Sequence, residues 1–175
     1  MKYRTLAVAL LLLLTGCGTN PPEPGPSETP APSTSQSADP LYEEAVAVAK
    51  AIDEIDRKYL YQNKYDPFPA EEYSEYADAG FVSATQDLYK NVSERQRETL
   101  DFEKAVIRYR EFPEVSKDGS EIALQQCVDA TEVKFRENGQ VSSGVKSQNV
   151  YFFKHVDGKL KAFSVKADKR TECSW

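Results

Sequence analysis

The spacing of apolar residues changes once along this chain, from one in every three or four positions to simple alternation. Over residues 41–59 the helical spacing predicts an amphipathic helix of about five turns. Asp39 and Pro40 stand directly before it, as a cap and a first helical residue would. Prolines then interrupt the pattern, and we expect a short second helix over 70–76 and a third over about 81–100.

Beyond residue 102 apolar and polar residues alternate, which is typical of strands that bury one face. Turn residues such as Asp157-Gly158 separate the alternating runs. The predicted strands cover 105–110, 122–128 with a continuation to 135 beyond a bend, 150–156 and 160–165. We therefore expect an α+β domain, in which three N-terminal helices pack on a curved antiparallel sheet of about four strands.

The start of the chain carries an export pattern. Lys2 and Arg4 precede an unbroken apolar run over residues 6–14. A helix of this length rises roughly 14 Å, about half of a bilayer core, so the run suits a secretory signal better than a spanning anchor. The next letters, LTGC, end at Cys17 and resemble a bacterial lipobox.

That resemblance implies cleavage before Cys17 and attachment of a diacylglyceryl group, with acyl chains such as palmitate, to its thiol. Two acyl chains anchor a protein stably, whereas one is marginal. Residues 1–16 are then a lipoprotein signal peptide, and 17–40 are the lipidated cysteine and a disordered linker that holds 7 of the chain's 10 prolines. Residues 41–175 suffice for one folded domain. An ordinary signal peptide with a chance cysteine is the alternative.

Charge is distributed unevenly along the chain. Without Lys2 and Arg4 there are 20 basic and 28 acidic side chains, a net charge of −8 that excludes a strongly basic nucleic-acid interface. Residues 146–170 reverse this balance, with 7 basic and 2 acidic side chains. The candidates for a basic surface are Lys159, Lys161 and Lys166. Such a surface would meet an anionic partner, and a merely solvated sheet face is the alternative.

Three short motifs carry a family resemblance over roughly residues 41–175. They are the run from Gln126 to Thr131, the run from Asp157 to Leu160, and Thr171-Glu172-Cys173 near the end. With the order of elements, they resemble exported, probably actinobacterial, lipoproteins that have a nuclear transport factor 2-like, cystatin-related cone-fold domain. The sequence departs from that pattern at Lys159-Leu160, where an aromatic residue often follows the turn.

The cysteines fit an oxidising compartment. Once Cys17 is assigned to lipid, Cys127 and Cys173 remain, and their simplest fate outside the cytoplasm is a disulfide. Closing that loop would stabilise the fold by about 4 kcal/mol in the chain-entropy model. Two separate buried thiols are the alternative.

Few residues suggest catalysis. His155 is the only histidine, and with Asp129 it forms a weak candidate acid–base pair, provided that the two side chains converge. No nucleophile elbow, phosphate-binding loop or dinucleotide fingerprint occurs, and the cysteines and histidine lack the spacing of a metal site. We expect no enzyme activity, no cofactor and no metal.

Together these features predict an extracytoplasmic surface protein, anchored by lipid at Cys17 to the outer face of the cytoplasmic membrane. We expect a non-catalytic module that binds an envelope protein or a wall polymer. The alternatives are a small-molecule enzyme that uses the cone cavity, an assembly subunit of an envelope or secretion machine, and a mobile-element lipoprotein that blocks phage entry.

Overall fold

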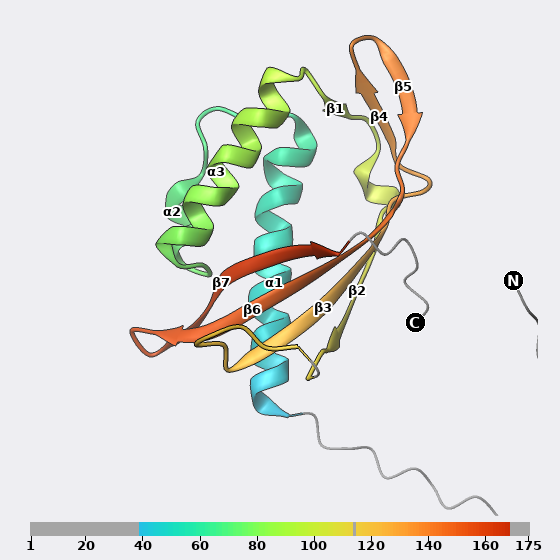
Figure 1. The fold of residues 1–175 in the computed structure, drawn as a ribbon. Coiled ribbons are helices and arrows are strands. Elements are labelled where there is room, and N and C mark those ends of the chain that lie inside the picture. The colour runs from blue at the N-terminus through green and yellow to red at the C-terminus, as the bar shows by residue number, and fades with distance from the viewer. Residues whose placement is uncertain (1–38, 114, 169–175) are drawn as a thin grey trace, which may run out of the picture. The chain divides into compact units, whose positions relative to one another are not determined.

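The chain folds into a helical layer and two antiparallel sheets in the computed structural model, which describes residues 39–113 and 115–168 (Figure 1). The helices are α1 (Pro40–Lys58), α2 (Ala70–Ser74) and α3 (Ala79–Glu94), with two 3-10 helices, η1 (Leu60–Gln62) and η2 (Phe102–Lys104). The strands are β1 (Glu98–Thr99), β2 (Val106–Glu111), β3 (Ile122–Asp129), β4 (Lys134–Glu137), β5 (Gln140–Ser143), β6 (Lys146–Val156) and β7 (Lys159–Asp168). The predicted α+β class is confirmed.

Side-chain caps start the two long helices. The Asp39 carboxylate accepts a hydrogen bond from the Leu41 amide at 3.0 Å, and Pro40 is the first helical residue, as predicted. Asp78 caps α3 in the same way, accepting from the Phe81 amide at 2.9 Å. Because such a cap satisfies an amide that the helix leaves unpaired, each fixes where its helix begins.

The third helix ends earlier than the sequence pattern indicates. We expected it to run to about residue 100, but α3 stops at Glu94. Gln96 then adopts a positive φ of 51°, a left-handed conformation that turns the chain out of the helix. The freed segment forms β1, which pairs with β4.

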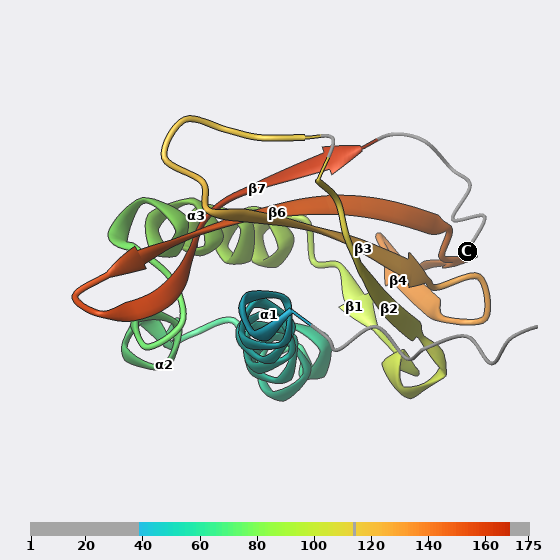
Figure 2. The same cartoon turned by 90° about the horizontal axis from the view of Figure 1, so that it is seen from below.

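The larger sheet has the strand order β2-β3-β6-β7, with every neighbouring pair antiparallel. All three α-helices lie on one side of it (Figure 2), and α1 contacts both β3 and β7. The pairing of β6 with β7 shifts register between Phe152 and Phe153, a bulge that gives β7 one extra residue. No helix in the part of the chain that the structure describes is long and apolar enough to cross a bilayer.

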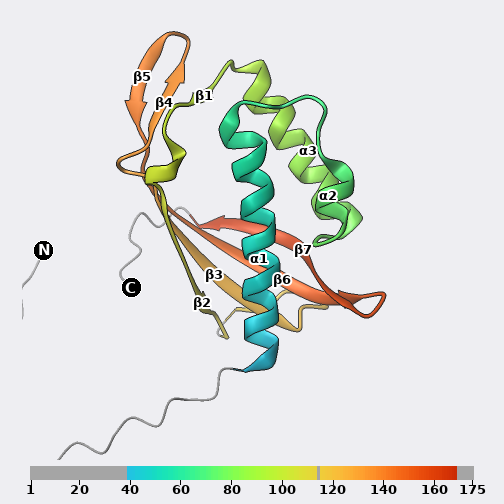
Figure 3. The same ribbon diagram turned by 180° about the vertical axis from the view of Figure 1, so that it is seen from behind.

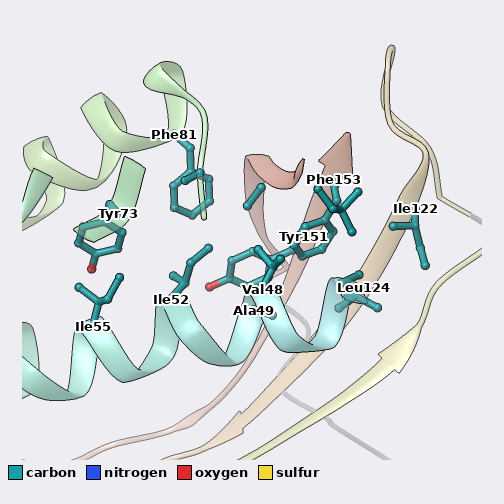
Figure 4. Close-up of a cluster of buried hydrophobic side chains, with 14 of the residues drawn as sticks. Val48, Ala49, Ile52, Ile55, Tyr73, Phe81, Ile122, Leu124, Tyr151 and Phe153 are labelled. Atoms are coloured by element: carbon teal, nitrogen blue, oxygen red, sulfur yellow. The ribbon is translucent and has the colours of Figure 1, made fainter. Parts of the chain in front are cut away.

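The space between α1 and this sheet is filled by side chains (Figure 4). Ile52 of α1 points toward Tyr151, and Phe153 and Leu124 lie nearby. Tyr151 exposes 6% of its surface, and each of the other three exposes no more than 1%. Tyr151 stacks on Phe153 with ring centroids 6.1 Å apart. The predicted helix stripe and the alternating strand faces therefore meet in one apolar cluster.

The opposite face of the sheet is also partly covered. Ala123, Val150 and Phe152 are buried there, and Phe112 and Val115, from the segment between β2 and β3, pack against them. Figure 2 shows that this segment passes over the side of the sheet away from the helices. The sheet therefore buries residues on both faces.

The second sheet was not predicted. We expected residues 131–135 to extend the preceding strand into a single sheet, but they lead into β4, which joins β1 and β5 in the order β1-β4-β5. All of β5 is exposed, so its residues show no alternation that could reveal a strand. The β4–β5 hairpin projects beyond the larger sheet, next to β1 (Figure 3).

Candidate functional site

An open apolar pocket lies where the β4–β5 hairpin meets the helical layer. Its volume is about 330 Å³, and its walls come from α3, both 3-10 helices, the hairpin and the adjoining ends of β3 and β6. The main apolar lining residues are Leu60, Leu88, Val92, Phe102, Val128 and Val145. A concave, mostly apolar site of this size is typical of places where proteins bind small molecules.

Two stacked rings form one wall of this pocket. Tyr61 of η1 and Phe102 of η2 are nearly parallel, with centroids 3.4 Å apart. The Arg57 guanidinium lies 5.0 Å from the centroid of the Phe102 ring. These contacts hold the two short helices together, which a three-residue helix cannot do by its own hydrogen bonds.

The hairpin reaches the pocket through a close backbone approach at Gly144. A Cβ atom at this position would lie 2.3 Å from the Ala130 carbonyl oxygen and 2.8 Å from the Phe135 ring. No other residue type fits there without a shift of the backbone. Gly144 therefore lets the returning chain pack against Ala130 and close that side of the pocket.

One charged residue faces the pocket. Arg97 lies among the lining residues, and its guanidinium is 4.4 Å from the centroid of the Phe135 ring. The Tyr65 hydroxyl donates a hydrogen bond to the Arg97 carbonyl oxygen, which ties the backbone at this point to the segment after η1. None of the fourteen described residues that line the pocket is acidic.

A buried polar network lies behind the pocket. Asp53 of α1, at 8% exposure, accepts hydrogen bonds from the Gln126 amide at 2.9 and 3.0 Å and from the Tyr109 hydroxyl. The Asn149 amide donates in turn to Gln126 at 2.8 Å. Gln126 is two residues before Val128 on the same strand face, so this network and the pocket are neighbours along the sheet.

A second acid lies one helical turn further along α1. Asp56 is half-buried and accepts hydrogen bonds from the hydroxyls of Tyr73 and Tyr89, whose own oxygens are 3.0 Å apart. Asp53 and Asp56 are three residues apart and lie on the side of α1 that faces the sheet and α3. The two carboxyl groups are therefore close enough to influence each other's titration.

Burial makes both acids weaker. Desolvation raises the pKa of Asp53 to about 7, and the neighbouring Asp56 charge adds to this effect. Desolvation likewise raises the pKa of Asp56 to about 6, against the opposing effect of its two tyrosine hydrogen bonds. Burial also raises the pKa of Tyr61, so its hydroxyl stays neutral. Near neutral pH the pair can hold a proton inside the fold.

The structure does not bring His155 and Asp129 together. His155 is exposed, and its Nδ1 lies 2.8 Å from a Glu121 carboxylate oxygen. Asp129 accepts from the Thr131 hydroxyl at 2.7 Å and pairs with Lys146 at 3.1 Å. Because Lys146 and His155 stand at opposite ends of β6, the hypothesis of an acid–base pair is wrong.

The register of the last hairpin places the three candidate lysines on one face of the sheet. Lys159, Lys161 and Lys166 stand opposite Val156, Lys154 and Val150, and this face points away from α1. The Lys161 ammonium turns to the sheet edge, where it donates to the Ser74 carbonyl oxygen at 2.6 Å. The role of these lysines as a basic surface stays a prediction.

The predicted modification sites fall largely outside the described residues. Cys17 and Cys173 both lie there, so lipidation and the disulfide stay predictions. Cys127 lies on β3, 5% exposed, on the face away from α1. No group of three or more His, Cys, Asp or Glu side chains within residues 39–113 and 115–168 could hold a metal ion.

Sequence reasoning missed Asp53 and Asp56, although a signal existed. Both fall within the apolar stripe of the first helix, beside Ile52 and Ile55, where exposed acids are not expected. Gln126 likewise interrupts an otherwise apolar strand face. Polar residues in apolar stripes predict buried partners, because an unpaired buried polar group is costly.

Comparison with known proteins gives no functional assignment. No family model and no curated protein matches this chain. The intermembrane space region of the chloroplast protein ARC6 is similar with a TM-score of 0.44 and 10% identity, over 70% of this chain and 95% of that chain. A de novo designed β-sheet protein is similar with a TM-score of 0.40 and 14% identity, over 76% and 94%. Both scores are too low to support an argument.

Proposed function

We propose that this protein is a lipid-anchored binding module on the outer face of the cytoplasmic membrane, which takes a small apolar molecule into its open pocket. The observation that carries the proposal is the pocket itself, about 330 Å³ in volume and lined mainly by apolar side chains. A soluble domain gains stability by filling such space, so an open apolar hollow favours a ligand-binding role.

Binding without catalysis is the function that the geometry supports best. The His155 and Asp129 side chains are separated, so the acid–base pair chosen from sequence has no common substrate position. Asp53 is engaged by Tyr109 and Gln126 and is buried behind the pocket. The hypothesis of a small-molecule enzyme therefore has no support from the residues on which it was based.

The anchoring part of the proposal rests on the sequence before the domain. The LTGC motif supplies Cys17 as the lipid attachment site, and residues 18–40 supply a proline-rich linker. At about 3.1 Å per residue, an extended linker of this length reaches roughly 70 Å at most. The module would therefore search for its ligand close to the membrane surface.

A cone-type fold and a Cys127–Cys173 disulfide complete the proposal. Cys127, Gln148 and Asp168 stand opposite one another on three neighbouring strands, which puts Asp168 roughly 10 Å from Cys127. Cys173 follows Asp168 by five residues, a length of chain that spans up to about 17 Å. The distance supports the pairing, which would hold the C-terminus against the sheet.

Filling the pocket should abolish ligand binding. Val128→Trp enlarges a partly buried side chain of the pocket wall, and Val145→Trp does so at an exposed position of the wall. We expect decan-1-ol to shift amide signals around the pocket in an NMR titration of the full chain carrying Cys17→Ser. Both tryptophan variants should weaken these shifts at least tenfold.

Val141→Trp is the matched control, because Val141 is exposed on the same hairpin and does not line the pocket. It should bind decan-1-ol like the parent chain. The proposal of an apolar binding site is wrong if the parent chain does not bind the alcohol, or if Val145→Trp folds normally and binds it unchanged.

Lipid attachment has its own test. A fatty-acid probe supplied to cells should label the protein, and Cys17→Ala should remove both the label and the membrane association. Cys127→Ala keeps the lipobox and should still be labelled. Persistent labelling of the Cys17→Ala protein would contradict the anchor assignment, whatever the pocket binds.

A further inference from the structure

The pocket combines an apolar lining with one cation that has no ionic partner. Within the described part of the chain, Arg97 forms no ion pair, whereas Arg57 pairs with Glu54 and Arg136 pairs with Glu98. Glu98, the sequence neighbour of Arg97, is thus engaged elsewhere. Arg97 carries a full positive charge beside an apolar hollow, and its charge is unbalanced there.

Two other surface hollows in the described part of the chain are acidic. The hollow between α1 and α2 is lined by Glu54, Glu72 and Glu75 with a single lysine. The one beside α3 is lined by Asp66, Asp87 and Glu94, again with one lysine. In a chain of net charge −6, the apolar pocket stands apart because its only charge is positive. The acidic hollows would repel an anion, whereas the apolar pocket would attract one.

Both the side chain and the backbone of Arg97 make contacts that hold it in place. Its guanidinium lies over the Phe135 ring, and Tyr65 binds its backbone carbonyl. A guanidinium stacked on an aromatic ring keeps the N–H groups around its edge available to a carboxylate. Because side chain and backbone are both held, little conformational freedom is lost when an anion binds.

Further polar groups of suitable kind lie on the pocket wall. Thr99 and Ser143 are among the lining residues, and the Lys134 ammonium donates to the Ser143 hydroxyl at 2.6 Å. A second positive charge therefore lies next to the pocket. The remaining walls are apolar, which suits a ligand with one charged end.

We propose that the ligand is an amphipathic monocarboxylate, whose apolar body fills the pocket while its carboxylate pairs with Arg97. This inference rests on the proposed function, because it names the ligand class of the same pocket. At about 30 Å³ for each water-sized group, 330 Å³ holds about eleven such groups. A medium-length fatty acid or an aromatic acid of similar size meets this limit, whereas a phospholipid does not.

Decanoate and decan-1-ol are matched probes, since they share the alkyl chain and differ in the charged end. In NMR titrations of the full chain carrying Cys17→Ser, decanoate should bind about tenfold more tightly than decan-1-ol. Arg97→Gln should remove this preference, because it should weaken the binding of decanoate far more than that of decan-1-ol. Arg97→Lys should restore part of it, because the charge returns without the planar, two-pronged geometry.

Arg95→Gln is the control, because Arg95 is an exposed arginine two residues away that does not line the pocket. It should retain the preference for decanoate. If both probes bind equally and Arg97→Gln changes neither, the carboxylate inference is wrong while the apolar binding site stands. If neither probe binds the parent chain, both the inference and the proposed function are wrong.

Discussion

The two ends of the space between helices and sheet differ in how they are filled. At one end Ile52, Tyr151 and Phe153 meet in a closed apolar cluster that leaves no room for a ligand. At the other end Tyr61 and Phe102 line an open pocket with a single cation. Asp53 and Asp56 lie on the stretch of α1 between the cluster and η1. Stability and binding therefore depend on different residues at the two ends of this space.

This division has a physical basis. Large aromatic side chains of β6 fill the layer where α1 contacts the sheet directly. Beyond the end of α1 the lining passes to two three-residue helices and a hairpin with exposed strands. Short elements bring fewer bulky side chains to the interior, so the space between them stays open.

The sharpest test of the filled end is Phe153→Ala. Phe153 is fully buried, so the change leaves a cavity that its neighbours cannot close, and we expect a loss of about 3–5 kcal/mol in the free energy of unfolding. Chemical denaturation measures this value, and Val141→Ala at an exposed position should cost less than about 0.5 kcal/mol. A loss below about 1 kcal/mol would show that this end is not the tightly packed one.

The buried acids Asp53 and Asp56 should lower the stability of the fold as the pH rises, the reverse of the usual effect of an aspartate. The pKa of Asp53 is raised from 3.8 to about 7 on folding, so the folded state binds more protons than the unfolded state between these values. The stabilising contribution of this group is then largest below about pH 4 and falls by roughly 3 kcal/mol between pH 4 and 7. Asp53→Asn cannot titrate and should flatten this fall in denaturation curves measured from pH 4 to 7.

Asp129→Asn is the control for that experiment. Hydrogen bonds from Thr131 lower the pKa of Asp129, and Lys146 acts in the same direction. Its contribution is present above the ordinary aspartate pKa and lost only at lower pH, so the slope from pH 4 to 7 should not change. An equal slope in the parent chain and in Asp53→Asn would show that Asp53 is ionised throughout.

The sequence predicted those parts of the fold that carry periodic patterns. The stripe of α1 and the alternation of β3, β6 and β7 gave the right elements, because a buried face selects its residues one by one. The Asp157-Gly158 turn was found for a different reason, since its positive φ angles favour these two residue types. The second sheet carries no such pattern, and β1 is only two residues long.

The candidate site was harder to predict than the fold. Arg97 and Thr99 are far from Gly144 in sequence, and each is unremarkable in its local context. They become a site only because η2 and the β4–β5 hairpin turn the chain back on itself. His155 drew attention as the only histidine, although rarity in composition says nothing of what a side chain contacts.

The extra residue in β7 decides which side chains share a face of the last hairpin. Odd-numbered Lys161 and even-numbered Lys166 would point in opposite directions in a regular strand, yet they stand opposite Lys154 and Val150, both on the outer side. The insertion resets the alternation near Phe163. Deleting a single residue there would place Lys161 and Lys166 on opposite faces of the sheet. The pattern of positive charge on the outer face therefore depends on one added residue.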